Sequence, residues 1–492
     1  MIHFSAPVSN QKCEFEMPCA QRRAGVLAPV FSLPTADFGS SVDDFLDFMQ
    51  KSGLTVWQML PLGPPLMDGS PYQCSSSFAL NPAFLSDDVL QKDPGFATEC
   101  TILERKQSLG ATASLLLEFR QFEHNESHWL VDYALFMAIK SVEHHASWLE
   151  WQPALRDRSP SALKLFSEQH TDLIFQIIFE QYLLHRQWMR IVDAAHQRGI
   201  FIYGDLPIFI AGDSADVWAN RALFQLDDRG LPLAVAGVPP DYFSITGQRW
   251  GNPLFDWTQM QENGFIWWRE RFKRHVMLFD WVRIDHFRGL AAYWSIPAQC
   301  DTAIGGRWID APGGALLEAL QRECSNHLPV IAEDLGVITD DVVALRKRFG
   351  LPGMLILQFA FDSDDENPYL PANHEPDSVV YTGTHDNDTS LGWWLGLNEA
   401  SRKRVREVLS EQLSISYDQP MPMALIAAAL ASVAQLAVIP MADWLGCDSQ
   451  GRINTPGTMT GNWTWQFASQ DLTDDLANSI NNLIQTYQRL PL

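Results

Sequence analysis

The chain has 492 residues, of which 46% are apolar and 19% charged, and its net charge of −24 comes from 59 acidic and 35 basic side chains. This composition is typical of a globular protein with a large core and excludes a disordered chain. The acidic balance argues against nucleic acid or an anionic membrane as a partner, since both bind basic patches, and it favours a neutral substrate.

Cysteine usage and the absence of targeting signals indicate the compartment. The seven cysteines are scattered and form no C-x-x-C pair, a pattern that suits reduced thiols in a cytoplasm better than a disulfide or zinc framework. Residues 1–17 contain no continuous apolar segment and predict no signal peptide. The apolar segment 423–439 is short for a membrane span, and we interpret it as a buried helix, 423–431, followed by a strand, 435–439. We therefore expect a cytoplasmic protein without a membrane span.

Short apolar segments recur along the chain, most of them separated by helical patterns such as the amphipathic stretch 41–52. Near-continuous apolar strands that alternate with helices predict a parallel sheet buried on both faces. Eight such units favour a closed (β/α)₈ TIM barrel, with an open doubly wound sheet as the alternative. The predicted strands lie within residues 24–30, 55–60, 199–205, 281–285, 328–336, 353–359, 378–386 and 435–439.

The repeat is interrupted between the second and third strands. Helical patterns there cover residues 103–122, 129–151 and 163–196, and no Gly- or Ser-rich linker separates them from the rest. We therefore predict one catalytic domain, 1–492, with a mostly helical insertion at 64–200. The segment 236–253, with glycines 237, 247 and 251 as pivots, is predicted to be a lid-like loop over the active site.

Acidic residues follow four of the predicted strands: Asp205, Asp285, Glu333 and Asp386. The active site of a (β/α)₈ barrel lies at the C-terminal ends of its strands, so four acids at one rim indicate a functional site. Two chemistries use such a ring. One is a divalent metal site that includes His385, and the other is glycosyl transfer with one carboxylate as nucleophile and one as acid.

Two features favour the sugar chemistry. Arg283, two residues before Asp285, lies on the same face of the strand, and a guanidinium beside a metal ligand is electrostatically unfavourable. The surrounding loops are rich in aromatic and amide side chains, which stack on sugar rings and bond their hydroxyls. These loops are residues 70–73, 239–243, 247–252 and 454–457.

Longer motifs carry a resemblance to a known family. The segments RIDHFRG (283–289), AEDLG (332–336) and THDN (384–387) resemble conserved segments of the α-amylase clan. With GSPYQCSSSFALNP (69–82), GDLPIFIAGDSADVW (204–218), VPPDYFSITGQRWGNPLFDW (238–257) and NTPGTMTGNW (454–463), the chain resembles the amylomaltase or disproportionating-enzyme family, the 4-α-glucanotransferases, from about residue 23 to 465. Cys74 departs from the small polar residue expected there. The resemblance implies a (β/α)₈ barrel with helical insertions and no C-terminal β-sandwich domain.

The resemblance also implies roles for the residues that match the motifs. Asp285 would be the nucleophile that forms a covalent glycosyl-enzyme, and Glu333 the general acid and then base. Asp386 would grip and distort the sugar as the third catalytic acid. Other residues would support the nucleophile or line the donor and acceptor subsites: Arg283, His286, His385, Asp205, Ser70, Tyr72, Trp250 and Asn454.

The resemblance implies retaining transfer between maltooligosaccharides or other α-1,4-glucans, with glucose as an acceptor, in maltose or glycogen metabolism. The alternatives are an α-amylase-type hydrolase and a non-catalytic glucan-binding protein. No phosphate-binding or dinucleotide loop is visible, so we expect no cofactor and no metal. We expect a monomer or a homodimer.

Overall fold

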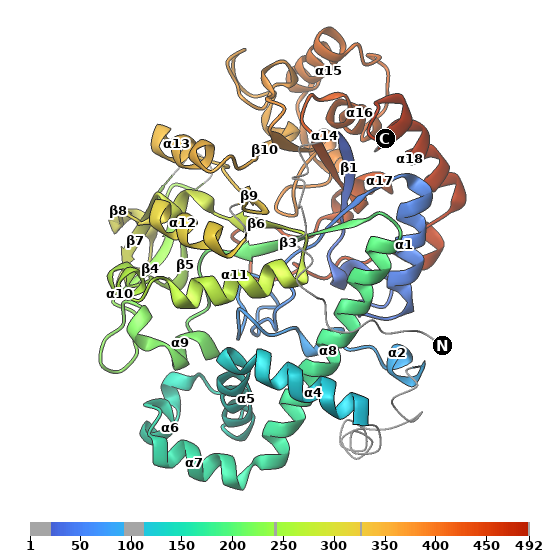
Figure 1. The fold of residues 1–492 in the computed structure, drawn as a ribbon. Coiled ribbons are helices and arrows are strands. Elements are labelled where there is room, and N and C mark those ends of the chain that lie inside the picture. Colours follow the sequence, from blue (N-terminus) through green and yellow to red (C-terminus); the bar gives the residue numbers. More distant parts are fainter. Residues whose placement is uncertain (1–20, 93–112, 241–243, 325–326, 491–492) are drawn as a thin grey trace.

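A computed structural model describes residues 21–92, 113–240, 244–324 and 327–490. Its main sheet has eight parallel strands in the order β10-β11-β12-β1-β2-β3-β6-β9. The Ala332 N–H, in β9, donates to the carbonyl of Pro352, next to β10, at 2.9 Å and brings the two outer strands together. The predicted (β/α)₈ barrel is confirmed, and the open-sheet alternative is wrong (Figure 1). The strands are β1 (Arg23–Leu27), β2 (Val56–Gln58), β3 (Phe201–Pro207), β6 (Trp281–Asp285), β9 (Val330–Ala332), β10 (Gly353–Ile356), β11 (Ser378–Tyr381) and β12 (Leu436–Pro440).

The strands are almost wholly apolar because both of their faces are buried. In β12, Val438 belongs to the cluster inside the barrel, whereas Ala437 and Ile439 pack against the surrounding helices. Alternation along a strand produces this division, and it explains why the segment reads as one continuous apolar run. Tyr203 and Tyr381 occupy the barrel interior with their hydroxyl oxygens 3.4 Å apart.

Helices cover the outside of the barrel. The helix α1 (Ser40–Ser52) buries Phe45, Leu46 and Met49, as its amphipathic pattern predicts. The helix α16 (Met423–Ala431) and strand β12 confirm our interpretation of the 423–439 segment. In the described part of the chain, every helix is too short or too polar to cross a membrane. The other covering helices include α11 (Ile266–Leu278), α12 (Gly313–Glu323), α13 (Asp340–Arg348) and α18 (Asp474–Thr486).

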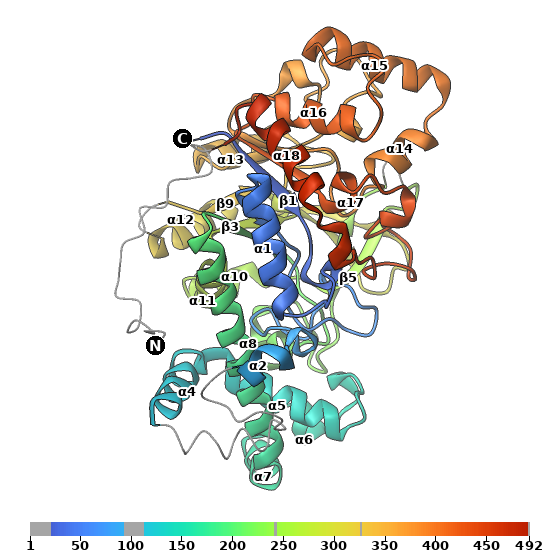
Figure 2. The ribbon, with the colours of Figure 1, turned by 90° about the vertical axis from the view of Figure 1, so that its right-hand side faces the viewer.

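The described part of the insertion is mostly helical, and α4 to α7 gather at one end of the molecule below the barrel (Figures 1 and 2). Two predicted helices were wrong in extent. The 129–151 pattern ends at Val142, and His144 follows with a φ of 54°, while the 163–196 pattern is split at His170. Part of the 103–122 pattern lies outside the described residues. The helices are α2 (Asp87–Lys92), α4 (Ala113–Asn125), α5 (Ser127–Val142), α6 (Pro153–Arg156), α7 (Pro160–Gln169) and α8 (Thr171–Gln197).

A second, four-stranded antiparallel sheet lies beside the barrel, and we did not predict it. Its strands are β4 (Ala234–Val238), β5 (Gln248–Pro253), β7 (Ala292–Pro297) and β8 (Arg307–Asp310), in the order β5-β4-β7-β8. The interpretation of 236–253 as a loop is therefore wrong at both of its ends. A Cβ on Gly237 would lie 2.2 Å from the Gln248 carbonyl oxygen, so this glycine permits close strand pairing. Residues 241–243 lie outside the described residues, and the lid role stays a prediction.

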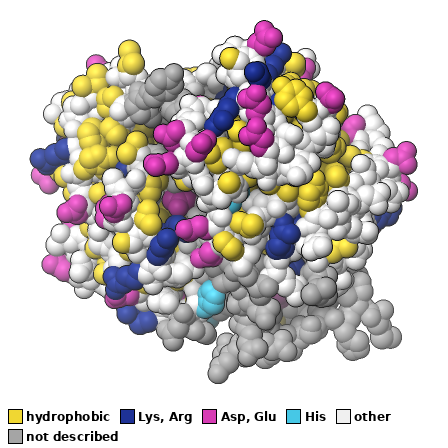
Figure 3. Space-filling model, turned by 90° about the horizontal axis from the view of Figure 1, so that it is seen from above, with side chains coloured by type: hydrophobic (Ala, Val, Ile, Leu, Met, Phe, Trp, Pro, Cys, Tyr) yellow, Lys and Arg dark blue, Asp and Glu magenta, His cyan; other side chains and the backbone are white. Residues whose placement is uncertain are grey.

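Surface charge is mixed on the face drawn in Figure 3. Acidic and basic side chains are scattered there among apolar and neutral ones. Among the described residues visible on this face, Lys and Arg side chains form no broad basic patch of the kind that nucleic acid binding requires.

Arg489 joins the C-terminal helix to the barrel, and its replacement should destabilise the fold. Its buried guanidinium donates to the carbonyls of Leu430, Arg23, Gln435, Ala429 and Ser432 at 2.7–3.3 Å. Arg489→Met removes all five hydrogen bonds. Arg22 and the Arg23 N–H still donate to the carbonyls of Leu430, Ser432 and Gln435, but those of Arg23 and Ala429 lose this donor, so we expect the free energy of unfolding to fall by about 3 kcal/mol. Denaturant unfolding measures the change, with the exposed Arg322→Met as control. Equal stability of the two variants would contradict this role.

Candidate active site

The barrel strands bring the acidic residues to one rim. Asp205 lies in β3 and Asp285 ends the neighbouring strand β6, where Asp205 pairs with Arg283 and Pro207 with Asp285. Glu333 directly follows β9, the next strand, and Asp386 follows β11. The predicted clustering at the C-terminal ends of the strands therefore matches the geometry of the barrel.

Arg283 links two of the acids. Its guanidinium donates to Asp205 Oδ2 at 2.6 Å and to Asp285 Oδ1 at 2.7 Å. Burial acts to lower the pKa of Arg283, but Asp205 and Asp285 raise it well above its ordinary value, so the group is a permanent cation. The Asp285 side chain is 27% exposed, which leaves the carboxylate accessible to a ligand while one of its oxygens is fixed.

Asp205 does not line a sugar subsite in this structure. Its side chain is fully buried and accepts hydrogen bonds from Arg283 and from the Tyr72 hydroxyl, the latter at 2.7 Å. Burial raises the pKa of Asp205 to about 6, against the charge of Arg283. The carboxylate contacts Arg283 and Tyr72 in place of the predicted sugar, because these two side chains cover it. The sequence predicts that Asp205 lies at the rim, but it does not show which side chains bury the carboxylate.

Glu333 has the environment of a protonated acid. It accepts hydrogen bonds from the backbone N–H groups of His286, at 2.5 Å, and Leu335, at 3.0 Å. Burial and the nearby charge of Asp285 raise the pKa of Glu333 to about 8, although Arg283 and both N–H groups act to lower it. At neutral pH Glu333 therefore holds a proton that it can donate.

His286 takes a left-handed backbone conformation, with a φ of 54°, directly after Asp285. This conformation belongs to the same turn that directs the His286 N–H to Glu333, and such backbone strain is often found at functional sites. The His286 ring meets Trp250 edge-on, with ring centroids 4.9 Å apart. Burial lowers the pKa of His286 to about 3, so the imidazole is neutral.

His286 and Trp250 form one wall of the site, and three other aromatic rings form a second wall. Tyr72 stacks on His385, with centroids 5.3 Å apart and an interplanar angle of 16°, and Trp463 lies within 6.0 Å of both rings. Ser70, also predicted, accepts a hydrogen bond from the Tyr72 N–H at 3.3 Å and shapes the turn that carries the ring. Burial lowers the pKa of His385. Trp463 was not singled out from the sequence, although it closes one of the motifs quoted above.

Asp386 lies beside this wall, where Asn454 and His385 contact its carboxylate. Asn454 Nδ2 donates to Asp386 Oδ1 at 2.6 Å, and His385 Nε2 lies 3.4 Å from Asp386 Oδ2. Arg452 was missed by sequence reasoning, and it donates to the carbonyls of Asp386 and Asn454 at 2.9 and 2.7 Å. The Asp386 side chain is 46% exposed and is therefore free to bind sugar hydroxyls.

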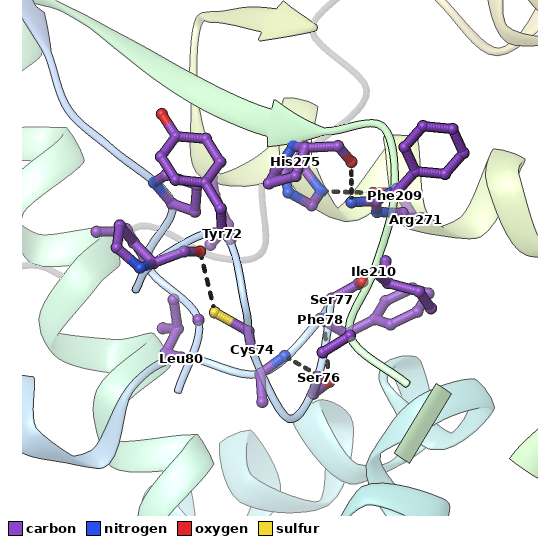
Figure 4. A pocket seen from close by; sticks show the side chains of 18 of the residues that line it. Tyr72, Cys74, Ser76, Ser77, Phe78, Leu80, Phe209, Ile210, Arg271 and His275 are labelled. Carbon is purple, nitrogen blue, oxygen red and sulfur yellow. Dashed lines mark hydrogen bonds between the residues drawn. The ribbon is translucent and has the colours of Figure 1, made fainter. Parts of the chain in front are cut away.

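Cys74 lies in the loop that carries Tyr72. Its thiol donates to the Pro71 carbonyl at 3.1 Å, and a cavity of about 40 Å³ adjoins both residues (Figure 4). Arg271 lines the same cavity and donates to the Pro207 carbonyl at 2.5 Å. Burial raises the pKa of Cys74 above its usual range, so the unexpected cysteine is a packed, uncharged side chain. The cavity is too small for a sugar ring.

The acids are arranged around a cation supplied by the chain itself. Arg283 fills the space between Asp205 and Asp285 that a metal ion would need. Among residues 21–92, 113–240, 244–324 and 327–490, no three His, Cys, Asp or Glu side chains gather in a group able to hold a metal. The geometry therefore favours sugar chemistry over the metal alternative.

Comparisons with known proteins agree with this geometry. A model of the family described as 4-alpha-glucanotransferase matches residues 28–471. The 4-alpha-glucanotransferase of Thermus thermophilus is 42% identical over 497 residues, which cover 95% of this chain and 99% of the relative, and that of Synechocystis is 41% identical over 500 residues, covering 95% and 98%. Amylomaltase from Streptococcus agalactiae, solved in complex with acarbose, superposes with a TM-score of 0.88 at 31% identity, covering 95% of this chain and 100% of that one. The chain belongs to the 4-alpha-glucanotransferase family.

Proposed function

We propose that Asp285 and Glu333 carry out the 4-alpha-glucanotransferase reaction by double displacement. The free oxygen of Asp285 attacks the anomeric carbon of a donor glucan, and Glu333 gives its proton to the departing glycosidic oxygen. Glu333, now a carboxylate, then takes a proton from an acceptor hydroxyl, whose oxygen displaces Asp285 from the anomeric carbon. Two inversions retain the configuration and regenerate both acids.

The contrast between the two acids carries this proposal. One oxygen of Asp285 is bound to the Arg283 cation at 2.7 Å, whereas the pKa of Glu333 is raised to about 8 by burial and the nearby Asp285. Carboxyl groups whose surroundings separate their protonation states are suited to act as nucleophile and general acid. The assignment of roles follows from this difference in environment.

Sugar binding falls to the second wall and to Asp386. Tyr72, in contact with His385 and Trp463, would offer a flat face for a glucose ring, while Asp386 and Asn454 would bond its hydroxyls. The related amylomaltase from Streptococcus agalactiae was solved in complex with acarbose, which supports a glucan as the ligand of this chain. We propose maltooligosaccharides as donors and maltooligosaccharides or glucose as acceptors.

Incubation with pure maltotriose tests the activity. Glycosyl transfer produces glucose together with a ladder of longer maltooligosaccharides, and chromatography resolves the products by length. Glucose and maltose without a ladder would assign the protein to hydrolysis, and the absence of any product would favour a binding protein.

The cellular setting is also a proposal. The scattered cysteines, of which Cys74, Cys300, Cys324 and Cys447 are free thiols in the described residues, support a reducing compartment such as the cytoplasm. There the enzyme would act in maltose or glycogen metabolism as a monomer or a homodimer. Light scattering of the purified chain tests the oligomeric state.

A further inference from the structure

A pair of amide side chains joins the Tyr72 loop to the second sheet. Gln73 Nε2 donates to Asn252 Oδ1 at 3.0 Å, and Asn252 Nδ2 lies 3.5 Å from Gln73 Oε1. Asn252 is only 4% exposed, so its amide depends on Gln73 and not on water. Such a reciprocal pair fixes the separation of the two segments that carry it, since a buried amide without its partner is costly.

Each amide is next to a group that flanks Asp285. Tyr72 precedes Gln73 and donates to Asp205, the partner of Arg283. Trp250 lies two residues before Asn252 in β5 and is separated from it by Gly251, whose φ of 85° interrupts the regular strand. The Trp250 ring contacts His286, the residue after Asp285. The amide pair thus connects the loop that carries the Tyr72 ring with the strand that carries the Trp250 ring.

We propose that Gln73 and Asn252 are positioning residues that hold Trp250 against His286 and thereby favour a sugar hydroxyl over water as the acceptor. The proposal rests on the function proposed above. Transfer requires that an acceptor sugar be stacked and oriented beside Asp285 while water is excluded. A displacement of about 1 Å in such a wall is enough to lose that orientation. The two amides act on the site through the segments that carry them, since their hydrogen bonds join Gln73 to Asn252.

A mutant set on maltotriose tests the pairing. It comprises Gln73→Met, which keeps length and packing but removes the amide, Asn252→Ala, their combination, and the exchange Gln73→Asn with Asn252→Gln. We expect each single variant to lower the ratio of transfer to hydrolysis by about 5- to 10-fold. The double variant should be no worse than the single ones, and the exchange should restore most of the ratio because it keeps both amides and their combined length. Gln259→Ala, an exposed amide on α10 (Trp257–Glu262), is the control.

The outcomes separate this inference from the proposed function. Single variants with the wild-type ratio, a double variant whose losses add, or an exchange that restores nothing would each overturn the positioning role. A wild-type enzyme that makes no ladder would overturn the proposed function instead. Thermal unfolding of every variant shows whether the variant is folded. Partial misfolding lowers the total rate of product formation but leaves the ratio of transfer to hydrolysis unchanged.

Discussion

Asp285→Asn is expected to reduce the rate of glycosyl transfer from maltotriose by roughly 10⁴- to 10⁶-fold, the range seen when a catalytic nucleophile is lost. The carboxamide keeps the shape of the side chain, but its oxygen is a poor nucleophile, so no glycosyl-enzyme forms. Product analysis over long incubations measures the residual rate.

An activated donor distinguishes the role of the nucleophile from that of the general acid. A maltosyl fluoride needs little protonation of its leaving group, so Glu333→Gln should form the glycosyl-enzyme and accumulate it, because the base for the second step is absent. Intact mass spectrometry should then show the added glycosyl group on Glu333→Gln and not on Asp285→Asn. A covalent adduct on Asp285→Asn would contradict the assignment of the nucleophile.

Glu333→Gln is expected to lower transfer from maltotriose by roughly 10²- to 10⁴-fold, the usual contribution of a general acid. In the wild type, kcat/KM should fall as the pH rises through about 8, since burial and the nearby Asp285 raise the pKa of Glu333 to about 8 and the proton is lost above that value. Initial rates between pH 6 and pH 10, at roughly half-unit steps, measure this limb. A wild-type profile that stays flat across that range would contradict the role of Glu333.

The same raised pKa predicts a change in stability. The folded protein holds the Glu333 proton more tightly than the unfolded chain, whose glutamate has an ordinary pKa of 4.5. The stability that this provides is complete below the ordinary value and is lost as the pH rises through about 8. Glutamine at position 333 does not titrate, so the Tm of Glu333→Gln relative to that of the wild type should rise as the pH increases from 4.5 to about 8. Calorimetry measures the gain, and the exposed Glu375→Gln should show none.

The barrel was predictable because its strands leave a clear pattern. Segments such as β12 are buried on both faces and read as unbroken apolar runs. Two of the four strands in the second sheet leave no such pattern, since β5 reads QRWGNP and β8 reads RWID, both partly exposed. The end of α5 near His144 was equally hidden, because a left-handed conformation at a residue other than glycine is set by its surroundings.

The site was predictable in its acids and less so in its contacts. Asp285 and Glu333 are marked by their place at strand ends, which chain order alone reveals. Asp205 shares that signal, but only the folded barrel shows that Tyr72 and Arg283 enclose it. Trp463 and Arg452 come from a long loop without periodicity, so no repeating pattern marks them.

The pairing of β1 with β12 has a consequence for the order in which the protein forms on the ribosome. β1 can pair with β2 early, but Arg23 also pairs with Leu436, more than four hundred residues later, so the barrel stays open between β1 and β12 until β12 has been translated. Asp285 and Glu333 emerge well before Asn454, which holds Asp386. A nascent chain that ends before β12 therefore has an open barrel and an incomplete sugar site. Activity therefore appears only after β12 and the Asn454 segment have been translated and β12 has joined β1.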